Sequence, residues 1–500
     1  MSTKNAKSNT GKWMALLAAI LGWLFDGFEM GLFPLIGQPA LKELLGEAAA
    51  GDAGKWFSII IAVFLIGAAT GGVLFGWLGD RIGRVKAMSL SIFTYAIFTG
   101  LCGFATEAWH IAALRFIASL GMGGEWSLGV ALVNEIWPGK SRAIVAGLIG
   151  AAANVGFLMV AFLSMGLIGM IESIQSGMLS LGLSQKTVEY LLHNSAWRFL
   201  MISGAFPALL IFMIRLFVPE SEKWEEEKEK GGTSHWATQD LIGVLIGCVG
   251  ALVIIYVWSP AGPGGWIAGL VTLIGLAIAL VGYLYPVKRY LERAMAAGSM
   301  TEGGKSHIIK MMVFGAALAG VALLGTWGAL QWAPRWAIDL AGPNASFAKE
   351  WTQVWSSLGA IVGTILAAVL CDYFGRRPVY AFLCAASLAA AYFLYRDTMV
   401  YGNTFLFAVF LAGSVSAAFY GWFPLYLPEL YPTSVRATGQ GFAFNFGRIL
   451  AAVGGLQTAT LMKHFDGSFP AAAKTMALIY VVGVIVVWFG PETKGKPLPE

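Results

Sequence analysis

The sequence is poor in charge and in histidine. Of its 500 residues only 12% are Asp, Glu, Lys or Arg, whereas 57% are hydrophobic, a balance far from that of soluble globular domains. Its five histidines lie near expected loops or at the ends of apolar runs, so no nucleophile with a base and no set of metal ligands is apparent. An enzyme is therefore not expected. A sensor is not expected either, because no loop is long enough to fold alone as an output domain.

Cysteine is also scarce. The four cysteines fall in or at the edge of apolar runs at unrelated spacings, which fits neither a disulfide framework nor a zinc site. We expect free thiols that pack as small apolar side chains, with no metal and no cofactor. They are Cys102, Cys248, Cys371 and Cys384.

The alternation typical of strands is absent, and long apolar runs take its place. About fourteen runs are long enough for a helix to cross about 30 Å of hydrocarbon. The prediction is an all-α polytopic membrane protein in a lipid bilayer, with both termini on one side because the number of spans is even. The expected spans are 13–36, 57–79, 87–105, 110–134, 143–170, 198–218, 241–258, 266–285, 308–330, 353–371, 379–395, 403–424, 437–460 and 474–490.

The basic residues indicate the orientation of these spans. Lys and Arg in the two tails and in alternate loops outnumber those in the other loops roughly two to one, which predicts cytoplasmic termini in a cell inner membrane. The net charge is +5, but the basic residues are not interleaved with aromatic residues as on a surface that binds nucleic acid, so no nucleic-acid partner is expected. The first apolar run resembles a signal peptide, but Asp26 and Glu29 interrupt it and its length suits a retained span.

The most informative pattern is an internal repeat. Asp80 in "GWLGDRIGR" corresponds to Asp372 in "VLCDYFGRR", 292 residues later. Glu135 in "EIWPGKSRA" corresponds to Glu429 in "ELYPTSVRA", 294 residues later. A third pair is "PES" after the sixth span and "PET" after the last. Three pairs in the same order indicate that the two parts of the chain run in parallel.

The repeat divides the chain into two six-helix halves. The N-terminal half is 1–220 and the C-terminal half is 306–500. The segment 221–305 has no counterpart, and we interpret it as a linker with an inserted two-helix hairpin. A membrane protein of this organisation is expected to act as a monomer.

At this point the sequence resembles the major facilitator superfamily over nearly all of its length. That superfamily's best-known signature is G-x-x-x-D-R-x-G-R. Further motifs are similar to those of the sugar-porter and metabolite:proton symporter branches. The matching residues are Gly76, Asp80, Arg81, Gly83 and Arg84 for the signature, and for the branches Arg115 with "GMGGE", Glu135, Pro138, Arg142, "PESEKW", "PELYPTSVRATG" and "PETKGKPLPE".

The two unpaired spans, with "DGFE" in the first span and "GMGGEW" in the fourth, are similar to sialic acid:proton symporters, which carry such an insertion. "DGFE" is also similar to the D-G-x-D of aromatic-acid symporters. The resemblance implies alternating access and symport driven by protons.

Charged residues at the expected cytoplasmic loops are interpreted as a latch between helices. Glycines beside them let helix ends approach, so that the basic side chains reach acidic partners. The alternative is that they are ordinary loop charges that set the topology. The gate residues are Asp80, Arg81, Gly83, Arg84, Glu135, Arg142, Asp372, Arg376, Glu429 and Arg436.

Few charges fall within the spans, and an ionised group there is costly unless it faces a cavity or a partner. If the first helix starts near residue 12 on the cytoplasmic side, Asp26 lies about 21 Å from that side. If the fourth helix starts near Trp109 on the outer side, Arg115 lies about 9 Å from the outer side. In a hydrocarbon core of about 30 Å these two depths coincide. We therefore predict that the two residues pair, and sugar symporters of the resembled superfamily have such a pair. The alternative is a static ion pair that fixes two helices. Glu29, one turn farther out, shares the cavity or faces the outer vestibule.

Two other intramembrane charges complete the candidates. Glu125 follows "GG" and either completes a proton path or pairs with a nearby loop arginine. Arg448 has no neighbouring acid in sequence, so either an anionic substrate binds it or it packs at the membrane interface.

The candidate substrate is a small polar organic anion such as sialic acid. Trp faces stack on sugar rings and amides bind hydroxyls, although most Trp residues in such proteins serve packing. The alternatives are neutral sugars and aromatic or dicarboxylic acids. The expected substrate site is Arg115, Trp126, Trp327, Gln331, Trp332, Asn445 and Arg448, and the expected proton-coupling site is Asp26, Glu29, Arg115 and Glu125.

Overall fold

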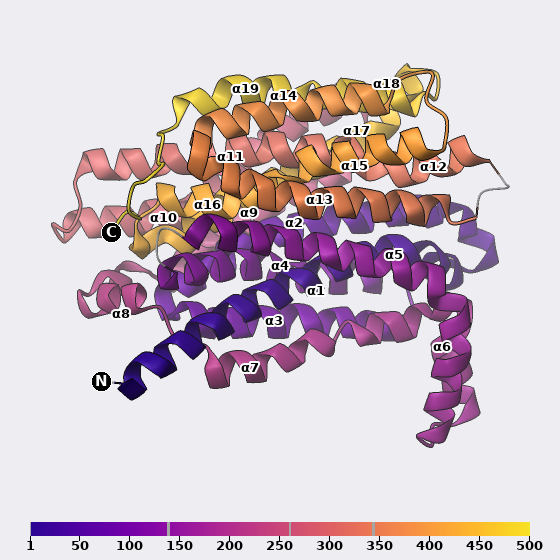
Figure 1. Cartoon of the computed structure of the whole chain (residues 1–500), viewed down its shortest axis with the longest axis horizontal. Coiled ribbons are helices and arrows are strands. Elements are labelled where there is room, and N and C mark those ends of the chain that lie inside the picture. Colours follow the sequence, from indigo (N-terminus) through magenta and orange to yellow (C-terminus); the bar gives the residue numbers. More distant parts are fainter. Residues whose placement is uncertain (1, 138–140, 260–261, 343–345) are drawn as a thin grey trace.

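The computed structural model describes residues 2–137, 141–259, 262–342 and 346–500, and every regular element among them is a helix (Figure 1). Within these ranges, eleven stretches are long and apolar enough to cross a membrane. The first of them, Thr10–Ile82, has 73 residues and contains two long helices. The all-α membrane class is therefore confirmed, whereas the count of fourteen crossings stays a prediction. Pro138 lies outside the described residues.

The α-helices are α1 (Ser2–Ala49), α2 (Ala53–Ile82), α3 (Arg84–Leu101), α4 (Ala108–Ile136), α5 (Arg142–Ser180), α6 (Gln185–Ser203), α7 (Leu210–Phe217), α8 (Glu222–Glu229), α9 (Leu241–Trp258), α10 (Gly265–Ala296), α11 (Glu302–Gly328), α12 (Ala333–Ala341), α13 (Ala348–Phe374), α14 (Arg376–Leu394), α15 (Asn403–Ala417), α16 (Phe419–Tyr426), α17 (Arg436–His464), α18 (Phe469–Ala477) and α19 (Ile479–Val486). The 3-10 helices are η1 (Ala50–Asp52), η2 (Cys102–Phe104), η4 (Phe206–Leu209), η5 (Gly232–His235), η6 (Thr238–Asp240), η7 (Leu330–Trp332), η8 (Leu427–Leu430), η9 (Thr433–Val435) and η10 (Val487–Phe489).

Helices α1 to α7 and α11 to α19 form two side-by-side groups, and both chain ends lie at the same end of the bundle (Figure 1). The groups meet where α2 packs on α17 and where α5 packs on α13 and α16. We call the end with the chain termini the terminal end. The loops between α2 and α3 and between α13 and α14 lie at this end, because the helices alternate in direction.

Small residues let helices cross closely within each group. A methyl group on Gly27 of α1 would overlap the backbone of Ala153 on α5, and one on Gly156 of α5 would overlap the backbone of Leu24 on α1. In a bilayer, where lipid is as apolar as leucine, such close packing is a main source of helix association. The crossing fixes the face of α1 that points to the centre of the bundle.

Helices α9 and α10, which the sequence predicts as an inserted hairpin, pack on each other and against α2, α11 and α17. The hydroxyls of Tyr283 on α10 and Thr70 on α2 lie 2.7 Å apart in a hydrogen bond. The hairpin therefore lies beside the α2/α17 contact. The four cysteines are free and buried, as predicted.

Candidate functional site

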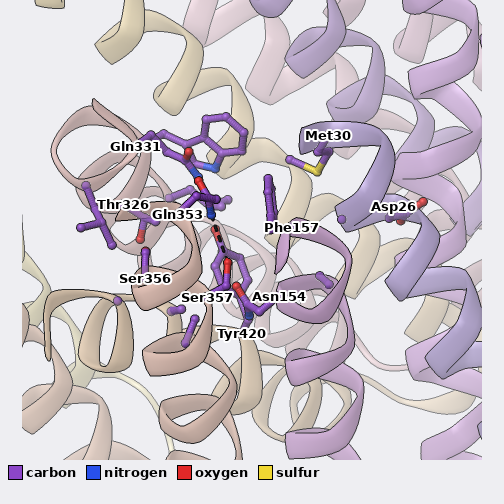
Figure 2. Close-up of a pocket in the computed structure, with 18 of the residues that line it drawn as sticks. Asp26, Met30, Asn154, Phe157, Thr326, Gln331, Gln353, Ser356, Ser357 and Tyr420 are labelled. Carbon is purple, nitrogen blue, oxygen red and sulfur yellow. Dashed lines mark hydrogen bonds between the residues drawn. The ribbon is translucent and has the colours of Figure 1, made fainter. Parts of the chain in front are cut away.

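A cavity lies between the two groups of helices, with an empty volume of about 860 Å³ that includes the space open to solvent. Helices α1 and α5 line it on one side, and α11, α13, α16 and α17 line it on the other. We call it the central cavity. Figure 2 shows its polar side chains, among which the Gln353 amide donates to the Ser357 hydroxyl at 3.1 Å. The labelled polar residues are Asp26, Asn154, Thr326, Gln331, Gln353, Ser356, Ser357 and Tyr420.

Two opposite charges line the central cavity. Asp26 of α1 and Arg448 of α17 are 5% and 6% exposed, and they interact electrostatically. Oδ1 of Asp26 and Nη1 of Arg448 have no hydrogen-bond partner among the described residues. The guanidinium lies over the Phe444 ring, 5.5 Å from its centroid. Arg448 is therefore a buried cation with donor capacity to spare, next to a carboxyl group.

Glu125 of α4 is the third member of this group. A methyl group on Gly22 of α1 would overlap the Glu125 carboxyl, so the glycine makes the space that this side chain occupies. Gly22 precedes Asp26 by one helical turn, and the two carboxyl groups interact electrostatically. Neither oxygen of Glu125 has a hydrogen-bond partner among the described residues. The central cluster of Asp26, Glu125 and Arg448 is electrically neutral when one carboxyl carries a proton.

The predicted pair of Asp26 and Arg115 is wrong. Nη1 of Arg115 lies 2.7 Å from Oε1 of Glu29, and the guanidinium also lies over the Phe33 and Phe64 rings. Equal depth is not sufficient for a contact, because side chains three residues apart differ in direction by about 60° around a helix. Glu29 takes the place that the sequence analysis gave to Asp26.

Asp80 of α2 reaches the other half of the chain at the terminal end. Its carboxylate accepts hydrogen bonds from the backbone N–H and the hydroxyl of Thr438, at 2.8 and 2.6 Å, and from the backbone N–H of Ala437 at 3.2 Å. Arg84 forms an ion pair with Asp80 at 2.7 Å and donates to the Thr433 carbonyl at 2.9 Å. These bonds tie α2 and α3 to the start of α17.

Further ion pairs join the halves at this end. Glu135 lies between Arg84 and Arg436, at 3.1 and 2.8 Å, and all three side chains are fully buried. Arg142 lies 3.7 Å from Glu429. Since each acid meets a base from the other half, the terminal end of the central cavity is closed by charge pairs.

The C-terminal half contains a similar arrangement. Arg376 pairs with Glu429 at 2.8 Å and with Asp372 at 3.1 Å. The Asp372 side chain is 43% exposed, and within the described part of the chain its ion pair is with Arg376 of its own half. The counterpart of Asp80 therefore does not bridge the halves.

A backbone contact occurs once in each half. Gly83 and Gly375 adopt φ angles of 111° and 94°, which favour glycine. The backbone N–H of the residue after each glycine donates to a glutamate near the end of the same half, Glu220 at 2.9 Å and Glu492 at 3.0 Å. Burial raises the pKa of Glu220 above its ordinary value. Burial acts in the same way on Glu492, but hydrogen bonds from four backbone N–H groups outweigh it and lower its pKa.

Comparison with known proteins decides the family. The model of the family described as "Sugar (and other) transporter" matches residues 14–240 and 338–500. The chain belongs to this family. It is a multi-pass membrane transporter of the major facilitator superfamily and not an enzyme.

Several known proteins are similar to the transporter. The cis,cis-muconate transport protein of Acinetobacter baylyi is 25% identical, with 99% of each chain covered. The sialic acid transporter NanX of Escherichia coli is 29% identical over 43% of this chain and 46% of its own. The structure of the proton:xylose symporter XylE of E. coli, bound to 6-bromo-6-deoxy-D-glucose, has a TM-score of 0.68 at 18% identity and covers 98% of each chain. The last likeness concerns the fold.

The predicted substrate residues of the transporter lie in different places. Trp327, Gln331 and Arg448 line the central cavity. Trp126 instead stacks on Phe444 with ring centroids 3.9 Å apart. Three others also lie away from the cavity lining: Arg115 in its ion pair, Trp332 against Phe469, and Asn445, which donates to the carbonyls of Gly123 and Gly441.

Several cavity residues are absent from the sequence prediction. Gln353, Ser356 and Ser357 follow the i, i+3, i+4 spacing that puts side chains on one helix face, and this spacing was the available signal. Asn154 and Tyr420 are single polar residues in apolar runs, and the sequence gives no comparable signal for them.

Most predicted gate residues take part in the charge pairs at the terminal end. Arg81 differs, because it lies over the Trp77 ring at 5.0 Å and donates to the Thr238 hydroxyl at 2.7 Å in the linker. Their role in gating stays a prediction.

Replacing Asp80 with Asn should loosen the closed end of the transporter. The change removes the negative charge of a carboxylate that accepts hydrogen bonds from two backbone N–H groups and a hydroxyl. Hydrogen bonds to a charged group contribute about 1.5–3 kcal/mol each. The Ser127 carbonyl accepts a hydrogen bond from Gln440 of the other half, so a cysteine at position 127 reports on the contact between the halves. In a cysteine-free background, we expect this cysteine to be alkylated roughly tenfold faster with the Asp80→Asn change than without it.

The matched control is Asp372→Asn, which removes the corresponding carboxylate without breaking a bond between the halves. Equal alkylation rates in the two variants would contradict a gating role for Asp80.

Proposed function

We propose that the transporter carries a small organic carboxylate together with a proton, by alternating access of the central cavity. The observation that carries this proposal is that Arg448, Asp26 and Glu125 form one buried cluster whose first two members line the cavity. A substrate carboxylate that binds Arg448 displaces Asp26 as the partner of the guanidinium. Asp26 then needs a proton, because an unpaired buried carboxylate is costly.

The same charge balance explains the coupling. The empty cluster is neutral with one proton on its two carboxyl groups. When an anionic substrate enters, neutrality is restored by one further proton. Because a buried net charge opposes closure around the substrate, the closed and loaded state forms with both substrate and proton or not at all. Transport of a substrate that is anionic at neutral pH is thereby coupled to the proton gradient.

The lining suggests the rest of the substrate. Amides and hydroxyls of Gln331, Gln353 and Ser356 suit a hydroxylated body such as that of sialic acid. The rings of Trp327 and Tyr420 offer faces to a sugar or to a planar acid. Relatives named for muconate and sialic acid, both carboxylic acids, support the carboxylate.

A ligand screen tests the substrate class. The ligands to screen are sialic acids, hexuronates, aromatic acids and dicarboxylic acids. At least one of them should raise the midpoint temperature of thermal unfolding of the purified transporter, because a ligand that binds only the folded state stabilises it. Neutral hexoses would leave Arg448 without an anion, so glucose and xylose should give no shift. Stabilisation by glucose or xylose, with no competition from any acid, would overturn the carboxylate and leave the fold intact.

For topology we propose cytoplasmic termini, fourteen crossings and the halves 1–220 and 306–500, in a cell inner membrane and with a monomer as the working unit. The support is the excess of basic residues in alternate loops. Single cysteines at 231–235 and 299–305 should react from the cytoplasmic side and a cysteine at Gly262 from the other. Labelling of position 262 from the cytoplasm would rule out the inserted hairpin as a pair of crossings.

A further inference from the structure

A second cavity lies within the N-terminal half, away from the central cavity. It is formed by α1, α3, α5 and the bend between α6 and η4, with an empty volume of about 1050 Å³ that includes open space. We call it the lateral cavity. Apolar side chains such as Phe25, Phe28 and Leu32 of α1 make most of its wall. The rings of Phe25 and Phe206 meet edge to face, 6.1 Å between centroids.

The mouth of the lateral cavity lies on the outer surface of the bundle. Met159 of α5 and Phe206 of η4 line the cavity and are 43% and 62% exposed. Helices α1, α3 and α5 belong to candidate membrane spans, so this surface faces the hydrocarbon of the bilayer. A ligand reaches such a mouth from the membrane.

Two buried polar atoms lie in this apolar wall. Glu29 and Tyr95 line the cavity and are 4% and 1% exposed. Oε1 of Glu29 is paired with Arg115, and the Thr99 hydroxyl lies near the same carboxyl group, but Oε2 of Glu29 and the Tyr95 hydroxyl have no partner within hydrogen-bond distance among the described residues. An unpaired buried polar group is unfavourable, because it has given up its hydrogen bonds to water. A carboxylate and a phenol that both lack partners in one cavity point to a ligand that supplies them.

The charge of that ligand follows from the ion pair. Glu29 and Arg115 already neutralise each other, so an ammonium or a second carboxylate would leave a net charge buried in the membrane. A hydroxyl is neutral and is both donor and acceptor. It offers a donor to Oε2 of Glu29 and an acceptor to the Tyr95 hydroxyl.

We propose that the lateral cavity binds a lipophilic alcohol from the membrane, with its hydroxyl between Glu29 and Tyr95 and its chain among the aromatic side chains of α1 and η4. The proposal is independent of the substrate and of proton coupling. Asp26 lies one turn from Glu29 on α1 and interacts with it electrostatically, so an occupied lateral cavity adjoins the central cluster.

Photolabelling tests the proposal. Transporter in phosphatidylcholine liposomes is exposed to hexadecanol that carries a diazirine in its chain, and the labelled peptides are identified by mass spectrometry. We expect labels concentrated near Phe28, Met159 and Phe206, and their loss with excess unlabelled hexadecanol. Hexadecyl methyl ether cannot donate to Glu29 and should compete roughly tenfold less well.

A pair of variants tests the location. Met159→Trp narrows the mouth and should reduce labelling near Phe206 several-fold. Leu148→Trp, at an exposed position of the same helix outside the cavity lining, should leave the labelling unchanged. Labels spread evenly over the lipid-facing surface, or equal competition by the alcohol and its ether, would overturn the proposal and leave water or ordinary lipid contact as the occupant. The competition in the unaltered protein decides this even if a variant folds poorly.

Discussion

Proteoliposomes that contain the Asp26→Asn transporter should exchange labelled substrate across the membrane but should fail to concentrate it under an inward proton gradient. Asn keeps the size and polarity of the side chain, so the cavity keeps its shape. It removes the carboxyl group that, in the proposal above, takes up a proton when the substrate carboxylate binds Arg448. Because Asn does not titrate, substrate binding at Arg448 is no longer linked to proton uptake at this position.

Glu29→Gln is the comparison for this experiment, because it alters the acid one turn away on the same helix. Glu29 pairs with Arg115 and lines the lateral cavity, so its loss should reduce accumulation less than the loss of Asp26. Should Asp26→Asn concentrate substrate as the unaltered protein does, Asp26 has no coupling role, and Glu125→Gln becomes the next variant to measure.

Arg448→Gln should weaken binding of the carboxylate substrate by about 10- to 100-fold, which corresponds to the loss of a charged hydrogen bond of about 1.5–3 kcal/mol. The variant keeps a polar group of similar reach at the cavity wall. A neutral amide of the same substrate should bind the variant and the unaltered transporter about equally, since it does not need the cation. Calorimetric titration of both ligands measures the difference.

Arg335→Gln provides the control for a general effect of lost positive charge. Arg335 is an exposed arginine on α12 and is not part of the cavity lining. Equal losses of affinity for the acid in the two variants would indicate long-range attraction rather than contact, and an unchanged affinity in Arg448→Gln would remove Arg448 from the site.

Hydropathy predicts the membrane class because each membrane crossing must be apolar over about 30 Å and must pair its own backbone N–H and C=O groups in hydrogen bonds. It does not predict where the helices end. The first span was expected to end at residue 36, whereas α1 extends to Ala49 with a break at Gly46, because helical turns continue beyond the hydrocarbon.

The site was predictable only in part, because a sequence gives the depth of a residue more readily than its direction. Asp26 and Arg115 have similar expected depths but different partners. Arg448 interacts electrostatically with Asp26, 422 positions away in the other half, and no local sequence pattern predicts this. The residues of the charge pairs at the terminal end were easier to predict, since their motifs occur twice in the sequence.

The C-terminal tail meets the closed end through its peptide groups. The carbonyl of Lys496 accepts from Arg142 at 3.3 Å and that of Pro499 accepts from Arg436 at 2.6 Å. Every residue type has a carbonyl, so this contact tolerates substitution of the tail but not its shortening. Loss of residues 496–500 would therefore remove two contacts of the closed end without changing any residue of the helices.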